Sequence, residues 1–155
     1  CKRWKVSLNP GKGEYVFGEK NDSRAILMKP LTGMNMSGKA VKEFCTNQGL
    51  SLSNVHVIVD DIDLPLGKLR IRPKGGDGCH RGMESIIYQN RDINFPRIRF
   101  GIAVGSNLRP SEQYVLNDFK KSDQNLADEM IVKAADAAEL IFEYGLNKAM
   151  NKYNA

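Results

Sequence analysis

The pattern of hydrophobic and polar residues changes its period along the chain, and each period predicts one kind of element. Apolar residues at every second position, or in short unbroken runs, indicate β-strands. A turn-rich segment at residues 19–23 separates the first two runs, which together predict a β-hairpin. The expected strands are residues 13–17, 24–28, 55–59, 69–72 and 97–104. The third of these runs is apolar on both faces, which is typical of a central strand in a covered sheet.

Apolar residues spaced three or four positions apart predict helices between these strands. A short helix follows Ser37 and ends at Gly49, with an apolar face made of Ala40, Val41, Phe44 and Cys45. The longest apolar stripe lies between Ser122 and Gly145 and contains Leu126, Met130, Ile131, Ala134, Ala138 and Ile141. Two further helices are expected at residues 82–88 and 146–153. Strands and helices interleave, so we expect one α/β domain, residues 1–155, with a mixed central β-sheet flanked by helices.

Size and composition narrow the class of protein. A chain of 155 residues and 17.3 kDa suits one domain, and 41% hydrophobic with 26% charged residues argues against disordered or collagen-like chains. No stretch approaches the roughly 20 apolar residues of a transmembrane helix, so we expect a soluble domain without membrane contact. The three cysteines are widely spaced and form no CxxC pair, which indicates a reducing compartment and no structural metal.

The positive charge is concentrated in one part of the chain. Residues 64–110 contain nine Lys or Arg and three acidic residues, whereas the whole chain has a net charge of +5. Such an excess favours a polyanionic partner such as nucleic acid, although a solvated basic surface has the same composition.

Three segments contain strings that are informative when they are taken together. They are KPLTGMNMSG at residues 29–38, VDDIDLPLG at 59–67 and GGDGCHRGMESI at 75–86. In this order they resemble the bacterial-type peptidyl-tRNA hydrolase family, whose corresponding strings are KPxTyMNxSG, DDxDLPxG and GGxxGHNGLxSI. Similar strings at residues 97–102 and 114–116 extend the likeness from about residue 25 to the C-terminus.

The resemblance implies a chemistry and assigns residues to it. Members of the family cut the ester between a nascent peptide and the 3′ ribose of tRNA, with no metal or other cofactor. A histidine acts as general base, a carboxylate orients it, and asparagine amides hold the peptide and the developing oxyanion. By motif position, the carboxylate is Asp60 and one of the amides is Asn35. Without the resemblance, a strand end at Asp60 and a helix cap at Asn35 are the simpler interpretations.

The family's general base has no counterpart in this sequence. It lies in an N-terminal TRHNxG string, whereas the two histidines here are His56 and His80. One alignment places Lys20 at the base; we prefer the alignment in which the first forty or so residues of the family's domain are absent from this chain. His56 precedes Asp60 by four strand residues, about 13 Å, and is expected to be a core histidine.

The third motif contains a second departure. His80 matches a histidine that the family keeps beside the site in a secondary, positioning role, and it is also a weaker candidate for a replacement base. Arg81 stands where the family has an asparagine, so a cation replaces an amide that binds substrate.

The basic residues that relatives use to grip the tRNA 5′ phosphate and acceptor stem correspond to Arg72 and Arg99. Arginine suits phosphate because its planar guanidinium is always charged and forms paired hydrogen bonds. Alternation along the strands projects Arg70 with Arg72, and Arg97 with Arg99, to one side in pairs, which predicts a basic face. The expected RNA-binding residues are therefore Arg72, Arg99, Arg70, Lys74 and Arg81.

These observations lead us to expect a peptidyl-tRNA hydrolase-like protein that binds tRNA or structured RNA and has lost or impaired hydrolysis. Such a protein would be an organellar or ribosome-associated factor in the mitochondrial or another organellar matrix, with the cytoplasm as the alternative. Its other expected partners are a ribosome or a protein that covers the missing N-terminal element. Two alternatives remain: an active hydrolase whose histidine segment is absent from this chain, and a structural subunit of a ribonucleoprotein.

Overall fold

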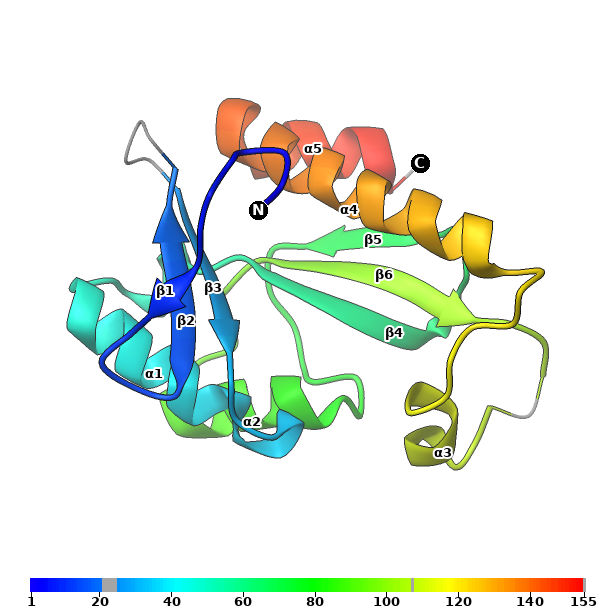
Figure 1. Cartoon of the computed structure of the whole chain (residues 1–155), viewed down its shortest axis with the longest axis horizontal. Coiled ribbons are helices and arrows are strands. Elements are labelled where there is room, and N and C mark those ends of the chain that lie inside the picture. Colours follow the sequence, from blue (N-terminus) through cyan, green and yellow to red (C-terminus); the bar gives the residue numbers. More distant parts are fainter. Residues whose placement is uncertain (21–24, 107, 155) are drawn as a thin grey trace. The chain divides into compact units, whose positions relative to one another are not determined.

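The computed structural model describes residues 1–20, 25–106 and 108–154 (Figure 1). These residues form two compact units. The first unit consists of Cys1–Val55 and Gly75–Asn94, and the second consists of His56–Lys74 and Phe95–Ala155. None of the helices in the described part of the chain is long and apolar enough to cross a membrane.

An antiparallel hairpin forms the N-terminal part of the first unit. Strand β2 (Tyr15–Glu19) pairs with β3 (Ile26–Pro30), so the predicted hairpin is confirmed, with each strand shifted by two residues. Most of the turn expected at residues 19–23 lies outside the described residues. The short β1 (Asn9–Pro10) pairs with β2, and its two residues are too few to show an alternating pattern in the sequence.

Two helices and two 3₁₀ turns complete the first unit: η1 (Met34–Met36), α1 (Ser37–Gln48), η2 (Leu52–Asn54) and α2 (Arg81–Asn90). Both helices are predicted by the sequence. Helix α1 ends at Gly49, whose φ of 65° lies in the left-handed region that glycine adopts readily. The rings of Tyr15, Phe17 and Phe44 pack together with centroids 5.4–6.1 Å apart and form an aromatic core between the hairpin and α1.

Helices α1 and α2 lie against each other (Figure 1). Gly38 of α1 lies close to the backbone of Ser85 in α2. The Gly38 N–H donates a hydrogen bond of 3.0 Å to the Ser85 hydroxyl in the buried contact. A Cβ atom at position 38 would collide with the Ser85 carbonyl oxygen. Glycine is therefore required here by the closeness of the two helices.

The second unit contains a three-stranded mixed sheet in the order β4-β6-β5. Strand β4 (Val57–Pro65) is parallel to β6 (Arg97–Ala103), and β5 (Leu69–Arg72) is antiparallel to β6. The predicted mixed sheet is confirmed. The expectation that residues 55–59 form its central strand is wrong for the described strands, because β6 lies in the middle and Ile58 is half exposed at the edge.

Helices α4 (Gln124–Tyr144) and α5 (Leu146–Tyr153) cover one face of this sheet (Figure 1). The core between them contains Leu69, Ile71, Ile98, Met130, Ala134, Ala137, Ile141 and Ala149. Both helices are predicted by the sequence, but the buried stripe of α4 is narrower, because Leu126 and Ile131 are exposed. The Asn154 side chain exchanges two hydrogen bonds of 2.8 and 2.9 Å with the Ile71 backbone, which fixes the end of α5 to β5. The five-residue α3 (Ser111–Val115) is not predicted by the sequence.

The contact between α1 and α2 gives the first testable prediction. Replacing Gly38 with alanine should lower the free energy of unfolding by about 1–3 kcal/mol, because the new methyl group forces the two helices apart. Chemical denaturation followed by circular dichroism measures this change. Gly76→Ala is the matched control, since a Cβ at position 76 meets no atom within 4 Å, and it should change stability by less than about 0.5 kcal/mol. Equal stability of the two variants would contradict the close contact.

Candidate functional site

The structure divides the predicted site residues between the two units. The first unit holds Asn35, His80 and Arg81, and the second holds Asp60, Arg70, Arg72, Lys74 and Arg99.

His80 is the N-cap of helix α2. Its Nδ1 atom accepts hydrogen bonds from the backbone N–H groups of Gly82, at 3.1 Å, and Met83, at 3.2 Å. These are two of the N–H groups that a helix leaves without partners inside its first turn. The side chain therefore has a structural function that the sequence does not reveal, because histidine is not among the preferred capping residues.

This geometry argues against His80 as a replacement base. Since Nδ1 accepts from two backbone amides, the neutral imidazole carries its proton on Nε2. To take a proton from water at Nε2, the ring would have to move its own proton to Nδ1, and the cap would then be lost. The arrangement favours the positioning role over that of a general base.

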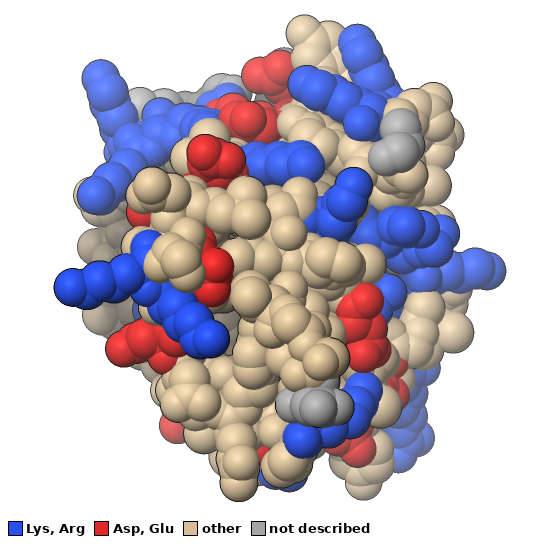
Figure 2. Space-filling view, turned by 90° about the vertical axis from the view of Figure 1, so that its right-hand side faces the viewer, with Lys and Arg blue, Asp and Glu red and all other residues tan. Residues whose placement is uncertain are grey.

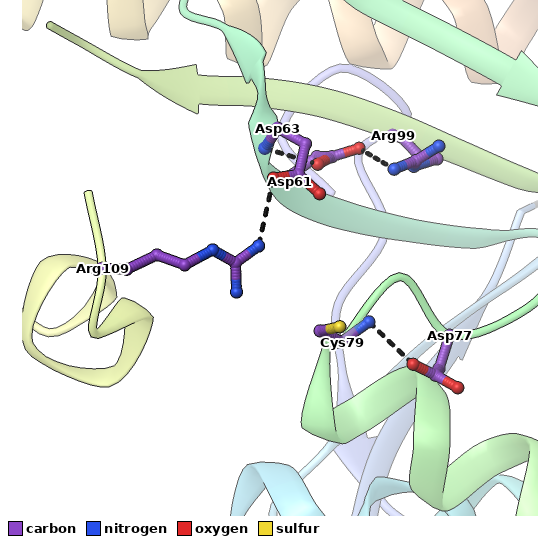
Figure 3. Close-up of polar contacts among 6 residues, drawn as sticks. All are labelled: Asp61, Asp63, Asp77, Cys79, Arg99 and Arg109. Carbon is purple, nitrogen blue, oxygen red and sulfur yellow. Dashed lines mark hydrogen bonds and ion pairs between the residues drawn. The ribbon is translucent and has the colours of Figure 1, made fainter. Parts of the chain in front are cut away.

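The glycine-rich loop before α2 is held by its own side chains (Figure 3). The Asp77 carboxylate accepts a 2.7 Å hydrogen bond from the Cys79 backbone N–H, and the Asp77 carbonyl accepts a 3.2 Å bond from that of His80. Cys79 itself adopts a φ of 60°. These bonds within the loop lie directly before His80 and help to place it at the cap position.

Asn35 and Arg81 line the same open pocket in the first unit, which has a volume of about 510 Å³. The other lining residues are Glu84, Ser85, Tyr88 and Gln89. Helical spacing explains the set, because positions 81, 84, 85 and 88 follow the i, i+3, i+4, i+7 pattern of one helix face. That spacing is the signal by which Glu84 and Tyr88 could have been found in the sequence.

Asp60 lies inside β4, which corrects the predicted strand at residues 55–59, because the strand does not end at residue 59. Strand β4 continues to Pro65, and its parallel register pairs Asp60 with Phe100. Alternation along the strand places Asp60 and Asp61 on opposite faces of the sheet. Phe100 packs against the α4–α5 core, so Asp60 belongs to the face that these helices cover.

The four arginines of β5 and β6 share the other face of the sheet, which we call the arginine face. Antiparallel register pairs Arg70 with Arg99 and Arg72 with Arg97, and directly paired residues point to the same side. Leu69 and Ile71 are buried in the core on the opposite side. The predicted pairing of these arginines on one side is therefore seen within this unit, and Lys74 is exposed just beyond β5.

The arginines differ in exposure. Arg72 is exposed, whereas Arg97 retains only 2% of its accessible surface. The Arg97 guanidinium lies 4.3 Å from the centre of the Phe95 ring and donates to the Phe95 carbonyl oxygen. Burial, and next the positive charge of Arg99, lower the pKa of Arg97. Arg97 and Arg99 are two residues apart on one face of β6, so their like charges lie near each other.

Arg99 forms an ion pair with Asp61, a residue that the sequence does not single out (Figure 3). Its Nη2 atom lies 2.5 Å from Asp61 Oδ2, and the Asp61 side chain is 5% exposed against 30% for Arg99. The other carboxylate oxygen of Asp61 accepts a 2.9 Å hydrogen bond from the Asp63 N–H. The exposed Asp63 carboxylate in turn contacts Arg109 at 3.3 Å. Alternation along β4 separates Asp61 from Asp60 in the sequence, but the pairing with Arg99 follows from the register of β4 with β6 and has no signal in the sequence.

Three further observations concern the expected partners, the expected ligands and His56. On the surface shown in Figure 2, Lys and Arg side chains are interrupted by Asp and Glu side chains and surround an uncharged area, so the positive charge there is not one unbroken patch. Within residues 1–20, 25–106 and 108–154, no three His, Cys, Asp or Glu side chains are grouped so that they could hold a metal ion. His56 is exposed, which corrects the expectation of a core histidine, because it precedes the first paired residue of β4.

Comparison with known proteins gives consistent results. A family model described as "Peptidyl-tRNA hydrolase" matches residues 1–155. A protein of that name from Thermoanaerobacter sp. (strain X514) is 44% identical, with 97% of this chain and 83% of the relative covered; one from Geobacillus kaustophilus (strain HTA426) is 38% identical, with 99% and 84% covered. The crystal structure of peptidyl-tRNA hydrolase from Acinetobacter baumannii matches with a TM-score of 0.89 and 27% identity, over 99% of this chain and 80% of that one.

These findings confirm the family resemblance and the α/β fold, and they correct other expectations. The mitochondrial or other organellar location is wrong, since the relatives are bacterial proteins and bacteria have no such compartment; the cytoplasmic alternative fits. They give no support for lost activity or for ribosome association, and they favour the active hydrolase that the sequence leaves as an alternative.

The capping geometry of His80 generates a second prediction. His80→Ala should lower the free energy of unfolding by about 1 kcal/mol, because two amides of α2 lose their acceptor. His80→Asn should recover most of this loss, since asparagine is one of the preferred N-cap residues. Thermal melting of the three proteins in parallel measures the difference. Equal destabilisation by both substitutions would show that the imidazole contributes something other than the cap.

Proposed function

Because the chain belongs to the peptidyl-tRNA hydrolase family, we propose that it hydrolyses the ester bond between peptide and tRNA. The observation that carries this proposal is the match to relatives of that name, at 38–44% identity over nearly the whole chain. tRNA is then the nucleic-acid partner, and the positive segment between residues 64 and 110 has a function in binding it. This replaces the expectation of a non-hydrolytic RNA-binding protein.

The pocket beside α2 is our candidate for the peptide side of the reaction. The Asn35 amide can donate to a peptide carbonyl or to the oxyanion that forms when water attacks the ester. Arg81 lines the same pocket and adds a permanent positive charge where relatives have an amide. That charge can also stabilise a developing negative charge, so the substitution is compatible with ester hydrolysis.

The general base is assigned to a histidine outside these 155 residues. His80 is engaged through Nδ1 in capping α2, and His56 is exposed and lies just before β4, four residues ahead of Asp60. Asp60 retains its assignment as the carboxylate that orients the base and stabilises its protonated form. Ester hydrolysis then needs no metal, because the base activates water and the amide stabilises the oxyanion.

The arginine face is our candidate for binding the tRNA backbone. Arg70 and Arg72 project from β5 on the side opposite the apolar core, and Arg99 lies beside Arg70 on β6. Arginine pairs at this spacing can bind phosphate oxygens through two hydrogen bonds each. Contacts of this kind position the RNA and do not read its sequence.

An assay of hydrolysis tests the proposal. It uses the protein made from the complete coding sequence that contains residues 1–155. This protein should release peptide from a model peptidyl-tRNA, and Asp60→Asn should lower kcat by about 10²–10⁴-fold, the usual contribution of a general acid–base group. Asp63→Asn is the matched control, because it removes the same charge from an exposed position in the same strand and should leave kcat within about threefold.

His80→Asn, which preserves the cap, should also leave kcat nearly unchanged. A loss as large as that of Asp60→Asn would identify His80 as the base. The absence of turnover in the complete protein would overturn the hydrolase proposal and restore that of an RNA-binding protein.

The salt dependence of tRNA binding tests the arginine face separately from catalysis. Replacing Arg70 and Arg72 together with alanine should reduce the log–log slope of affinity against salt by about 1.5, because each lost phosphate contact removes roughly 0.7–0.9. Fluorescence anisotropy between about 50 and 200 mM salt measures the slope. Lys2→Ala with Lys12→Ala removes the same charge from exposed positions in the other unit and should change the slope less. Equal slopes for the two double variants would exclude the arginine face as the binding surface.

A further inference from the structure

The Asp61–Arg99 pair is the most buried charged contact on the arginine face. Asp61 has 5% of its side chain exposed, and a carboxylate in such a place is stable only with a cation or hydrogen-bond donors close by. Arg99 supplies the cation and the Asp63 N–H supplies the donor. Without Arg99, Asp61 would keep only the hydrogen bond from the Asp63 N–H. Arg99 itself is less buried, with about a third of its side chain exposed to solvent.

Arg99 lies beside other arginines, so a fixed anion next to it can help to hold its side chain in place. Arg99 is paired directly with Arg70 across the strands, and Arg97 lies two residues away on the same face. Like charges at such positions repel, and repulsion would turn the Arg99 side chain away from its neighbours. The Asp61 carboxylate attracts the same guanidinium from the other neighbouring strand and offsets this repulsion.

The pair leaves most of the guanidinium available. Only Nη2 contacts Asp61, and a guanidinium carries five N–H donors in a planar fork. Among the described residues, Asp61 is the only one that forms an ion pair with the Arg99 guanidinium, and no side-chain hydrogen bond of Arg99 is seen. A phosphate can therefore bind to Arg99 while Asp61 remains in contact with it.

We propose that Asp61 is a positioning residue that holds the Arg99 guanidinium in place for phosphate binding on the arginine face. This proposal rests on the proposed function of that face in binding tRNA. Asp61 acts only through Arg99 and makes no contact with the RNA. The consequence is unusual for a polyanion site, because removing a negative charge should weaken the binding.

The sign of that effect provides the test. We expect Asp61→Asn to bind a tRNA transcript about three- to tenfold more weakly, which lies within the coupling range of contacting charged groups. Asp63→Asn removes the same charge two residues away on the same face of β4, so by Coulomb attraction alone it should bind equally well or more tightly. Asp61→Glu, which restores the carboxylate, should bind within about twofold of the original protein. In hydrolysis, Asp61→Asn should raise KM and leave kcat unchanged, as expected for lost uniform binding.

A double-mutant cycle shows whether the effect passes through Arg99. In an Arg99→Gln background, Asp61→Asn should change tRNA affinity by less than about twofold, because the side chain that it positions is gone. Equal or tighter binding by Asp61→Asn, or the same loss in both backgrounds, would overturn the proposal. A parent protein that binds no tRNA would instead refute the proposed function.

Thermal melting of each variant shows that it is folded at the assay temperature. If Asp61→Asn is unfolded at the assay temperature, the variant Arg99→Lys is assayed in its place. Lysine keeps the positive charge beside Asp61 but lacks the planar fork of a guanidinium. Weaker binding by Arg99→Lys than by Arg91→Lys, an exposed control, would support an oriented fork. Equal binding by these two variants would refute it.

Discussion

The position of β6 between a parallel and an antiparallel neighbour constrains most of the second unit. Successive residues of a strand point to opposite faces, so β6 must present two different surfaces along one short segment. Ile98 and Phe100 face the helices, while Arg97 and Arg99 face the other way. The same register brings Arg99 to Asp61 on one face and Asp60 to Phe100 on the other. A shift of one residue would exchange these surfaces and bury the arginines in the apolar core.

The motifs that indicate the family contain residues of two kinds. Some carry chemistry in our proposal, as Asn35 and Asp60 do. Others hold the structure together: Gly38 and Ser85, from the first and third motifs, form a close buried contact between α1 and α2, and His80 caps α2. Motif membership alone therefore does not separate a catalytic residue from a packing residue. Hydrogen-bond partners and distances make that distinction.

The sequence predicts the elements whose apolar residues recur at a regular spacing. It does not predict the features that depend on how the strands pair in three dimensions. Helices α1, α2, α4 and α5 and the mixed sheet follow from apolar spacing, and the arginine pairs follow from strand alternation. The end of β4 does not, because acidic residues 60–63 lack the apolar alternation by which strands are recognised, although they continue the pairing. In α4, small alanines occupy the buried stripe, while Leu126 and Ile131 are exposed. A prediction that assigns the larger apolar residues to the core therefore places the buried face of α4 incorrectly. The Asp61–Arg99 pair depends on which strand neighbours β6, and a single sequence does not specify that order.

The buried Arg97 explains why arginine rather than lysine suits this face. Burial and the charge of Arg99 both lower the pKa of Arg97, and a lysine under the same influences could lose its proton. Arginine stays charged because its intrinsic pKa is far above that of lysine, and its planar group can stack on Phe95 while donating to the Phe95 carbonyl. Arg97 thus places a permanent positive charge below the surface. The Asp61 carboxylate on the neighbouring strand forms its ion pair with Arg99, the residue of β6 that extends toward the solvent.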